Sequence, residues 1–186
     1  MNHIRILWVS LAVLILDLIT KYIIKFTMHL HQSIPVIGDF FRLTYVENEG
    51  MAFGLHFGHT SFFTVFAIAA SVAIIMYLFK MKGDHLLARL AMAIIFGGAI
   101  GNLSGRLFRG RVIDFLDFEF FDINIPAFKI LFIHFPGYNL DRWPVFNVAD
   151  IAVTVGMMIL LVFILFENQE ENKKLLKEEV DSQIIH

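Results

Sequence analysis

Two carboxylates in this sequence, Asp114 and Asp150, have the residue type and the setting for acid–base chemistry. Each lies next to a long apolar segment. Two carboxylates held together at a partly dehydrated site do not both ionise readily, so one tends to keep a proton. The ionised group can take a proton from an attacking water while the protonated group donates to the developing oxygen and later to the leaving amine of a peptide bond. The pair therefore predicts hydrolysis without a covalent intermediate.

Both carboxylates also have a structural interpretation. Asp114 has arginines close to it in the sequence, and Asp150 stands where an aspartate often caps a helix. Taken alone, the residue types and positions favour a catalytic role and a structural role for the two aspartates about equally. Asp17 and Lys21 lie one helical turn apart, so their side chains can pair. We interpret this second pair as a support that ties its helix to its neighbours, without a direct part in the chemistry.

Further polar residues are expected in the same half of the membrane as these carboxylates. Asn102 and Arg106 stand at the outer end of one apolar segment, and Asn147 stands at the outer start of another. Charged groups at membrane depth usually face a bundle interior or a water-filled cavity, which predicts a functional site. The alternative class, a proton-coupled or small-solute transporter, would place polar groups at the midplane and in both halves. The inner halves of these segments are nearly uncharged, which disfavours it.

The composition predicts a membrane protein. Of the 186 residues 58% are hydrophobic and 17% are charged, and the mean hydropathy is +0.70. A water-soluble domain of this size could not bury so much apolar surface. The formal net charge of -2 lacks the basic excess that nucleic-acid binding requires. The absence of cysteine excludes disulfides, thiolate metal sites and a thiol nucleophile.

Four apolar runs approach the roughly 20 residues that a bilayer core requires. They are residues 6–24, 62–79, 86–103 and 151–166. The first run is too long for a cleaved signal peptide and no small-residue cleavage site follows it. Four spans place both termini on one side, where the basic residues are denser, so the termini are predicted to be cytoplasmic. We expect a four-helix membrane domain over residues 1–166 and a charged, helical cytoplasmic tail over residues 167–186.

The segments between the spans carry weaker signals. Residues 41–45 alternate apolar and polar, which predicts a strand, and Asn48-Glu49-Gly50 predicts a turn. The aromatic-rich residues 105–144 are expected to form a membrane-hugging loop with short helical or strand pieces. The glycines in residues 97–107 favour close helix packing over nucleotide binding. The histidines lack partners at diagnostic metal-ligand spacing, so no metal is predicted.

The sequence resembles bacterial lipoprotein signal peptidases, the type II signal peptidases. Four ordered blocks carry the resemblance: DLITK at residues 17–21, NEGMAFG at 48–54, GGAIGNLSGRLFRGRVIDF at 97–115 and FNVAD at 146–150. Together they cover nearly the whole chain apart from the tail. The ordered set on a four-span frame is specific to this family.

The resemblance implies an all-α membrane protein with four transmembrane helices and a small extracytoplasmic β platform, in the bacterial cytoplasmic (inner) membrane. It implies an aspartyl protease that cuts the signal peptide from a prolipoprotein before a diacylglyceryl-modified cysteine, at the extracytoplasmic face. Asp114 and Asp150 would be the catalytic dyad. Substrate-binding or supporting roles fall to Asn48, Gly50, Asn102, Arg106, Asn147, Asp17 and Lys21. Lipidated prolipoproteins and membrane lipid would be the partners, with no cofactor and no obligate protein partner.

Two features depart from the family pattern. Gly105 stands where the family has an acidic residue, so Arg106 or Lys21 could lose a charge partner. A catalytically impaired relative of the peptidase is therefore a second alternative. The interval of 36 residues between Asp114 and Asp150 is longer than usual. We interpret the excess, residues 118–142, as an enlarged extracytoplasmic loop that covers or widens the site.

Overall fold

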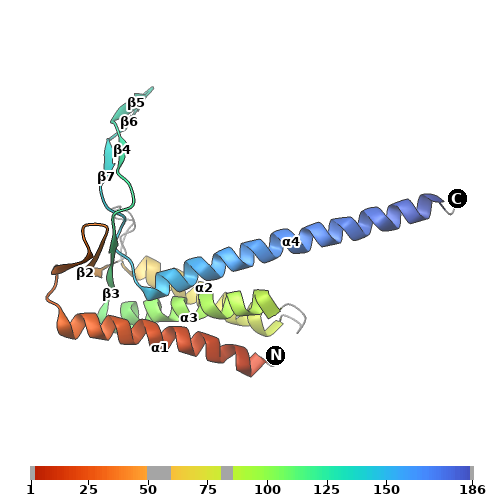
Figure 1. The fold of residues 1–186 in the computed structure, drawn as a ribbon, viewed down its shortest axis with the longest axis horizontal. Coiled ribbons are helices and arrows are strands. Elements are labelled where there is room, and N and C mark those ends of the chain that lie inside the picture. Colours follow the sequence, from red (N-terminus) through yellow and green to blue (C-terminus); the bar gives the residue numbers. More distant parts are fainter. Residues whose placement is uncertain (1–2, 50–59, 81–85, 185–186) are drawn as a thin grey trace.

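Four helices and a small sheet at one end of them form the frame of the protein (Figure 1). This computed structural model describes residues 3–49, 60–80 and 86–184. The helices are α1 (His3–Thr27), α2 (Thr60–Lys80), α3 (Leu86–Arg109) and α4 (Val148–Ile184). Each expected apolar run lies inside one of them. Gly50, one of the expected site residues, lies outside the described residues.

Among the described residues, three helical stretches are long and apolar enough to cross a membrane: Arg5–Thr27, Leu86–Arg109 and Val148–Glu167. Helix α2 contributes the shorter apolar stretch Thr64–Phe79. Many large apolar side chains on the helices face outward and are exposed, among them Trp8, Phe66 and Met158. Lipid rather than protein would cover such a surface, because exposed apolar area of this extent is unfavourable in water.

Helix α3 is the centre of the bundle and packs against the other three helices. Small residues permit this close packing. A Cβ atom at Gly98 would lie 2.5 Å from the carbonyl oxygen of Ala149 on α4, a distance that real Cβ atoms do not tolerate. The glycine stretch therefore serves helix packing, as expected from the sequence. At the end of the bundle away from the sheet, a small buried apolar cluster joins α1, α2 and α3; its members are Ile6, Leu78, Met92, Ala93 and Ile95.

The three-stranded antiparallel sheet has the order β1-β2-β3. Its strands are β1 (Ser33–Ile37), β2 (Phe41–Asn48) and β3 (Val112–Phe118). The predicted strand at residues 41–45 is confirmed, and it continues to Asn48. The sheet is seated on the end of α1 by a buried apolar cluster of Ile24, Met28, Tyr45, Ile113 and Phe115. These contacts place both β2 and β3 beside the ends of the helices.

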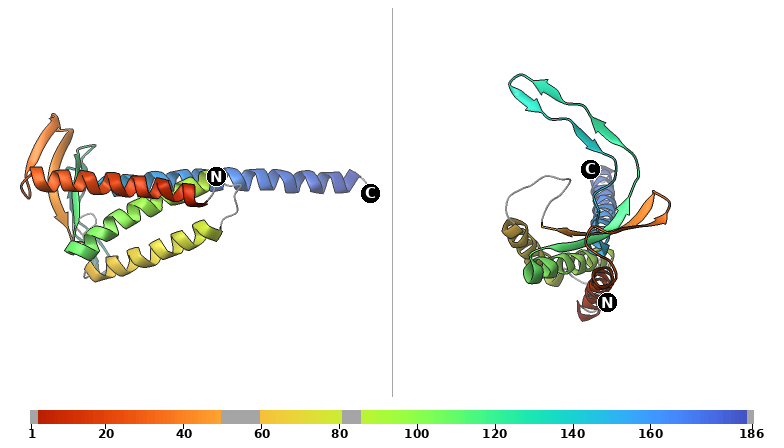
Figure 2. Two further views of the ribbon diagram at one scale, coloured as in Figure 1. Left: turned by 90° about the horizontal axis from the view of Figure 1, so that it is seen from below. Right: turned by 90° about the vertical axis from the view of Figure 1, so that its left-hand side faces the viewer.

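The long interval before α4 forms a projecting β-ribbon (Figure 1, Figure 2). Its strands are β4 (Ile123–Ile125), β5 (Phe128–Ile130), β6 (Ile133–Phe135) and β7 (Tyr138–Leu140), paired β4 with β7 and β5 with β6. The expected strand pieces are therefore present. In this structure the ribbon points away from the helices, so it does not cover the site described below.

The first residue of α1 and the last of α4 lie at the end of the bundle opposite the sheet (Figure 1). Helix α4 continues without interruption through the boundary at residue 166 to Ile184, so the expected helical extension is present. Both ends of the described chain are therefore remote from the polar residues at the sheet.

Candidate active site

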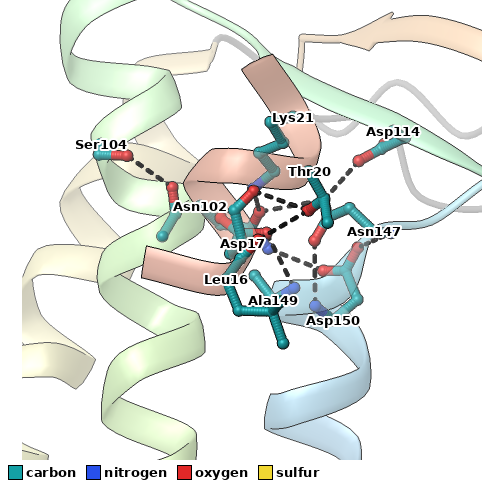
Figure 3. A network of polar contacts seen from close by, with 11 residues as sticks. Leu16, Asp17, Thr20, Lys21, Asn102, Ser104, Asp114, Asn147, Ala149 and Asp150 are labelled. Carbon is teal, nitrogen blue, oxygen red and sulfur yellow. Dashed lines mark hydrogen bonds and ion pairs between the residues drawn. The ribbon is translucent and has the colours of Figure 1, made fainter. Parts of the chain in front are cut away.

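The polar residues singled out in the sequence meet where the sheet joins the helices (Figure 3). They come from five elements that are distant in the sequence. Helix α1 supplies Asp17 and Lys21, α3 supplies Asn102, and the turn into α4 supplies Asn147 and Asp150; Asn48 and Asp114 come from β2 and β3. The network lies at one end of the bundle instead of running along it, which does not support a transporter.

Asn147 and Asp150 cap α4 reciprocally. The backbone N–H of Asn147 donates to Oδ2 of Asp150 at 3.0 Å, and the backbone N–H of Asp150 donates to Oδ1 of Asn147 at 3.1 Å. This is the geometry of a capping box, which satisfies N–H groups that have no partner inside the helix. The expectation that Asp150 caps its helix is therefore confirmed for the oxygen Oδ2. The other, Oδ1, accepts a hydrogen bond from Nδ2 of Asn102 at 2.7 Å.

Asp114 is held by amide groups. Its Oδ1 accepts from Nδ2 of Asn147 at 2.6 Å, and its Oδ2 accepts from Nδ2 of Asn48 at 3.0 Å. In the described part of the chain no arginine donates to this carboxylate, so the expected alternative of an arginine pair is wrong. The side chain is only 4% exposed. Burial, and then the negative charge of Asp150, raise the pKa of Asp114 to about 7 despite the two amide bonds.

Asn147 joins the two carboxylates, since its side-chain amide donates to Asp114 and its backbone N–H donates to Asp150. The amide of Asn102 is oriented by Lys21. Nζ of Lys21 donates to Oδ1 of Asn102 at 2.8 Å, which leaves Nδ2 of Asn102 to donate to Asp150. Because an ammonium group can only donate, this contact determines which end of the amide faces the carboxylate.

Asp17 and Lys21 form the expected pair, with Nζ 2.7 Å from Oδ2 of Asp17. Both are almost completely buried, at 0% and 1% exposed. The second carboxylate oxygen of Asp17 accepts from the backbone N–H of Ala149 at 3.0 Å, which adds a cap on α4 from another helix. A Cβ atom at Gly101 would lie 2.5 Å from Oδ2 of Asp17, so any larger residue there would displace this carboxylate. The pair holds α1, α3 and α4 together, as a support would.

At Gly105 and Arg106 the sequence was expected to depart from the pattern of the family that it resembles. Arg106 lies close enough to Asp114 and Asp150 for their charges to act on its guanidinium, and its buried Nε has no hydrogen-bond partner among the described residues. A Cβ atom at Gly105 would lie 3.5 Å from Nη2 of Arg109, whose Nη1 is also buried without a partner there. Lys21, in contrast, has a charged partner in Asp17.

A second charged cluster, which sequence reasoning missed, lies where the ribbon leaves the sheet. Asp117 of β3 accepts from Oγ1 of Thr44 at 2.5 Å and from Nε of Arg142 at 2.8 Å. Nη1 of Arg142 also contacts Glu119 at 2.5 Å and donates to the carbonyl oxygen of Asp39 at 2.9 Å. We call these residues the root cluster. The cluster depends on the β2–β3 pairing and on the return of the ribbon, both of which are properties of the folded chain, so the sequence carried no signal for it.

An open cleft of about 290 Å³ lies beside Asp150. Its lining is mostly apolar; the lining residues are Trp143, Phe146, Asp150, Ile151, Thr154 and Val155. Because Ile151 and Val155 also belong to the exposed apolar surface of α4, the cleft communicates with the side of the bundle that lipid would cover. No group of three or more metal-ligating side chains occurs among residues 3–49, 60–80 and 86–184.

The chain is similar to proteins of one family over most of its length. A family model described as signal peptidase (SPase) II matches residues 9–166. The lipoprotein signal peptidase of Desulfitobacterium hafniense is 38% identical over 170 residues, covering 90% of this chain and 98% of that protein. That of Geobacter sulfurreducens is 39% identical over 169 residues, covering 89% and 92%.

Two solved structures, both described as bacterial membrane enzymes, have a similar fold. One has a TM-score of 0.72 at 28% identity and covers 89% of this chain and 90% of its own. The other has a TM-score of 0.68 at 30% identity and covers 87% and 92%. None of these similarities supports a transporter or an impaired relative of the peptidase.

Proposed function

The chain belongs to the signal peptidase II family, and from that premise we propose that it cuts signal peptides from diacylglyceryl-modified prolipoproteins with an aspartate dyad. The family accounts for signal-peptide cleavage of prolipoproteins by a bacterial membrane protease. Our proposal adds the residues, the aspartic mechanism and the lipid modification of the substrate. One observation carries it: Asn147 binds both Asp114 and Asp150, which come from different elements, in a buried polar network.

Asp114 is the general acid in this proposal. Burial and the neighbouring charge raise its pKa to about 7, so it retains a proton in much of the neutral population. Asp150 is the general base, because it borders the cleft in which a substrate would lie. Different environments therefore assign different roles to two chemically identical groups.

The reaction then has two steps. The oxygen of a water bonds to the scissile carbonyl carbon while one of its protons passes to Asp150 and the proton of Asp114 passes to the carbonyl oxygen. In the second step Asp150 gives its proton to the amide nitrogen, the carbon–nitrogen bond breaks, and one hydroxyl of the intermediate returns a proton to Asp114. The products are a carboxylic acid and an amine, and both aspartates regain their starting states.

The remaining polar residues position the dyad or the peptide. Asn102 and Asn147 hold the two carboxylates, and Lys21 with Asp17 holds Asn102. Arg106 has a buried N–H without a partner among the described residues, so it can donate to a peptide carbonyl or to the charge that develops on it. Asn48 holds Asp114 from the sheet side. Gly50 keeps its proposed supporting role from the sequence alone.

The cleft beside Asp150 suits an apolar chain attached to the scissile peptide. Its lining is apolar apart from Asp150 and Thr154, and it opens towards the lipid-facing side of α4. An acyl chain or an apolar stretch of signal peptide could enter sideways from the outer leaflet without crossing water. We therefore propose a substrate that is anchored in lipid at the bond to be cut.

The proposed topology has four spans, with α2 as the fourth, and cytoplasmic termini. It is supported by the position of the N-terminal end of α1 and the C-terminal end of α4 on the same side, opposite the sheet (Figure 1). The sheet and the dyad would then lie at the extracytoplasmic face as a small β platform. Residues 1–166 would form the peptidase domain, and residues 167–186 would extend α4 into the cytoplasm.

The proposal is tested by substituting each carboxylate with its amide. Asp114→Asn and Asp150→Asn should each lower cleavage of a lipidated prolipoprotein by about 10²–10⁴-fold, the usual contribution of a general acid or base. Asp39→Asn is the matched control, because Asp39 is exposed and distant from the dyad. Normal cleavage by either dyad variant, while its folding is unchanged, would disprove the assignment.

A further inference from the structure

We propose that the β-ribbon, residues 123–140, lies on the outer leaflet of the bilayer with its apolar side chains in contact with lipid, on the side of the bundle where the substrate cleft opens. The inference rests on the proposed topology, in which the sheet end of the helices faces outward. It assigns a binding partner, the lipid surface, to the segment between β3 and α4.

Strand register divides the ribbon into an apolar and a polar set. Side chains of directly paired residues lie on the same face of a two-stranded ribbon, and successive residues alternate between faces. In each half of the ribbon, the outer two pairs of residues are apolar and the middle pair is polar. The apolar pairs are Ile123 with Leu140, Ile125 with Tyr138, Phe128 with Phe135, and Ile130 with Ile133. The polar pairs are Asn124 with Asn139 and Lys129 with His134.

Most of the apolar side chains of the ribbon whose burial is described are exposed, and only Ile123 and Leu140, next to the root, are partly buried. Its strands contact chiefly each other, and the rings of Phe128 and Phe135 stack with centroids 4.7 Å apart. At the tip, Leu131 is 80% exposed and Phe132 is 95% exposed. Moving such side chains from water into lipid is favourable, because it removes apolar surface from water. A two-stranded ribbon is also marginal on its own, so it requires a surface to support it.

The position of the ribbon favours lipid as that surface. It begins level with the start of α4 and runs across the direction of the helices instead of along it (Figure 1). Seen along the helices, it extends outward beyond the α4 side of the bundle (Figure 2). The spanning helices determine where the bilayer surface lies, and the ribbon follows that surface at the level where aromatic side chains concentrate in membrane proteins.

The root cluster determines this direction. Arg142, at the return of the ribbon, contacts Asp117 and Glu119 as well as the backbone of Asp39. Aromatic contacts continue from the root into the cleft: Phe118 stacks on Phe146 at 5.8 Å, and Phe120 meets Trp143 edge to face at 6.3 Å. Two of these rings, Phe146 and Trp143, line the cleft beside Asp150. The ribbon therefore extends over the lipid from which a substrate would enter.

Depth measurements test the lipid contact directly. Because the chain has no cysteine, a single Phe132→Cys change gives one labelling site for an environment-sensitive fluorophore. Lys129→Cys is the matched control, because Lys129 belongs to the polar middle pair of the β5–β6 half, close to the tip. In phosphatidylethanolamine–phosphatidylglycerol vesicles, brominated lipid should quench the Phe132 probe, and aqueous iodide should quench the Lys129 probe. Equal access of iodide to both probes would overturn the proposal.

Two further measurements distinguish lipid contact from contact between protein copies and from the chemistry of the dyad. Protection of the Phe132 probe that appears only as the ratio of protein to lipid rises would indicate contact between copies of the chain, and would overturn the proposal. The same labels on an Asp150→Asn background should give the same depths, because the lipid contact does not depend on the dyad. A wrong dyad and a wrong ribbon assignment are thus distinguished.

The functional consequence is tested with the tip changed to acid. Leu131→Asp/Phe132→Asp should raise the KM for a lipidated substrate in vesicles by about tenfold, the equivalent of 1.4 kcal/mol of lost lipid contact. The kcat should stay unchanged, and so should cleavage in detergent micelles, where no flat bilayer surface exists. Leu131→Ala/Phe132→Ala should give a smaller rise. An equal loss in vesicles and micelles would indicate a folding defect and would overturn the functional consequence.

Discussion

Strand β3 carries two buried aspartates, three residues apart, whose hydrogen-bond partners differ in charge. Asp117 is paired with the guanidinium of Arg142 and a threonine hydroxyl. Among the residues that the structure describes, only amide N–H groups donate to Asp114, which also stands in the field of another carboxylate. The contact of Asp117 with Arg142 is an ion pair that ties the ribbon to the sheet, which is a structural role. Amides leave the carboxylate able to hold or release a proton, which is what acid–base chemistry requires.

The sharpest test of this comparison makes the same change at both positions. Asp114→Asn should lower cleavage by about 10²–10⁴-fold because no proton can then be donated. Asp117→Asn should leave kcat near that of the unchanged protein but lower the midpoint of thermal unfolding, because Arg142 loses its charged partner. Cleavage rates and thermal unfolding curves of both variants test this difference between Asp114 and Asp117. The comparison fails if Asp117→Asn abolishes the chemical step in a folded protein.

A second test compares two cations that pair with carboxylates: Lys21, which pairs with Asp17, and Arg142, which belongs to the root cluster. Lys21→Met should lower the free energy of unfolding by about 3–5 kcal/mol, because Asp17 would stay buried without its partner. Arg142→Met should lower it less, since Arg142 is partly exposed and water can solvate the remaining carboxylates. Asp17→Asn/Lys21→Met is the control and should recover part of the loss. An equal loss for the single and double variants would show that Asp17 is not held as an ion.

The pKa of Asp114 predicts opposite responses of stability and activity to substitution. Its folded-state pKa, about 7, exceeds its ordinary value of 3.8, so ionised Asp114 destabilises the fold. This loss in the free energy of unfolding is absent below pH 3.8. It grows by about 1.4 kcal/mol per pH unit as the pH rises to about 7, and it is constant above that pH. Asp114→Asn should therefore raise the unfolding midpoint more at pH 8 than at pH 5.

Cleavage by the unchanged protein should fall as the pH rises through about 7, approaching tenfold per unit, because the general acid loses its proton. Initial rates on a lipidated substrate across this range provide the measurement. Asp117→Asn should keep the same profile, since Asp117 takes no part in the proton transfer. A cleavage rate that does not change from pH 6 to 9 would show that Asp114 is not the general acid.

The smallest expected effect concerns Gly105. A Cβ there would lie 3.0 Å from the carbonyl oxygen of Arg111, so Gly105→Asp requires a small backbone shift. The new carboxylate would approach Arg109, whose buried Nη1 lacks a partner among the described residues. Cleavage should change by no more than about threefold, or 0.6 kcal/mol. Activity that appears only after this change would show that the unchanged chain is an impaired peptidase.

Local patterns predicted much of the fold. The apolar runs located all four helices because hydrophobic length is a property of a single segment, although α1 and α3 extend beyond the expected residues 6–24 and 86–103. The cap formed by Asn147 and Asp150 was partly predictable because its members lie three residues apart. The alternation at residues 41–45 located β2 for the same reason. The ribbon strands were not separately predicted, because strands of three residues depend on a partner strand.

Contacts between distant residues could not be predicted from residue types alone. Asp17 caps Ala149 across 132 positions of the chain, and Asp117 pairs with Arg142 only because the ribbon returns to the sheet. The sequence by itself determined a membrane protein with four apolar helices and a set of polar residues near one end, because burial in lipid depends on composition and length. Tertiary structure alone decided which aspartate faces amides and which faces an arginine. That choice depends on the packing of elements far apart in the chain, and it decides which carboxylate can carry a proton.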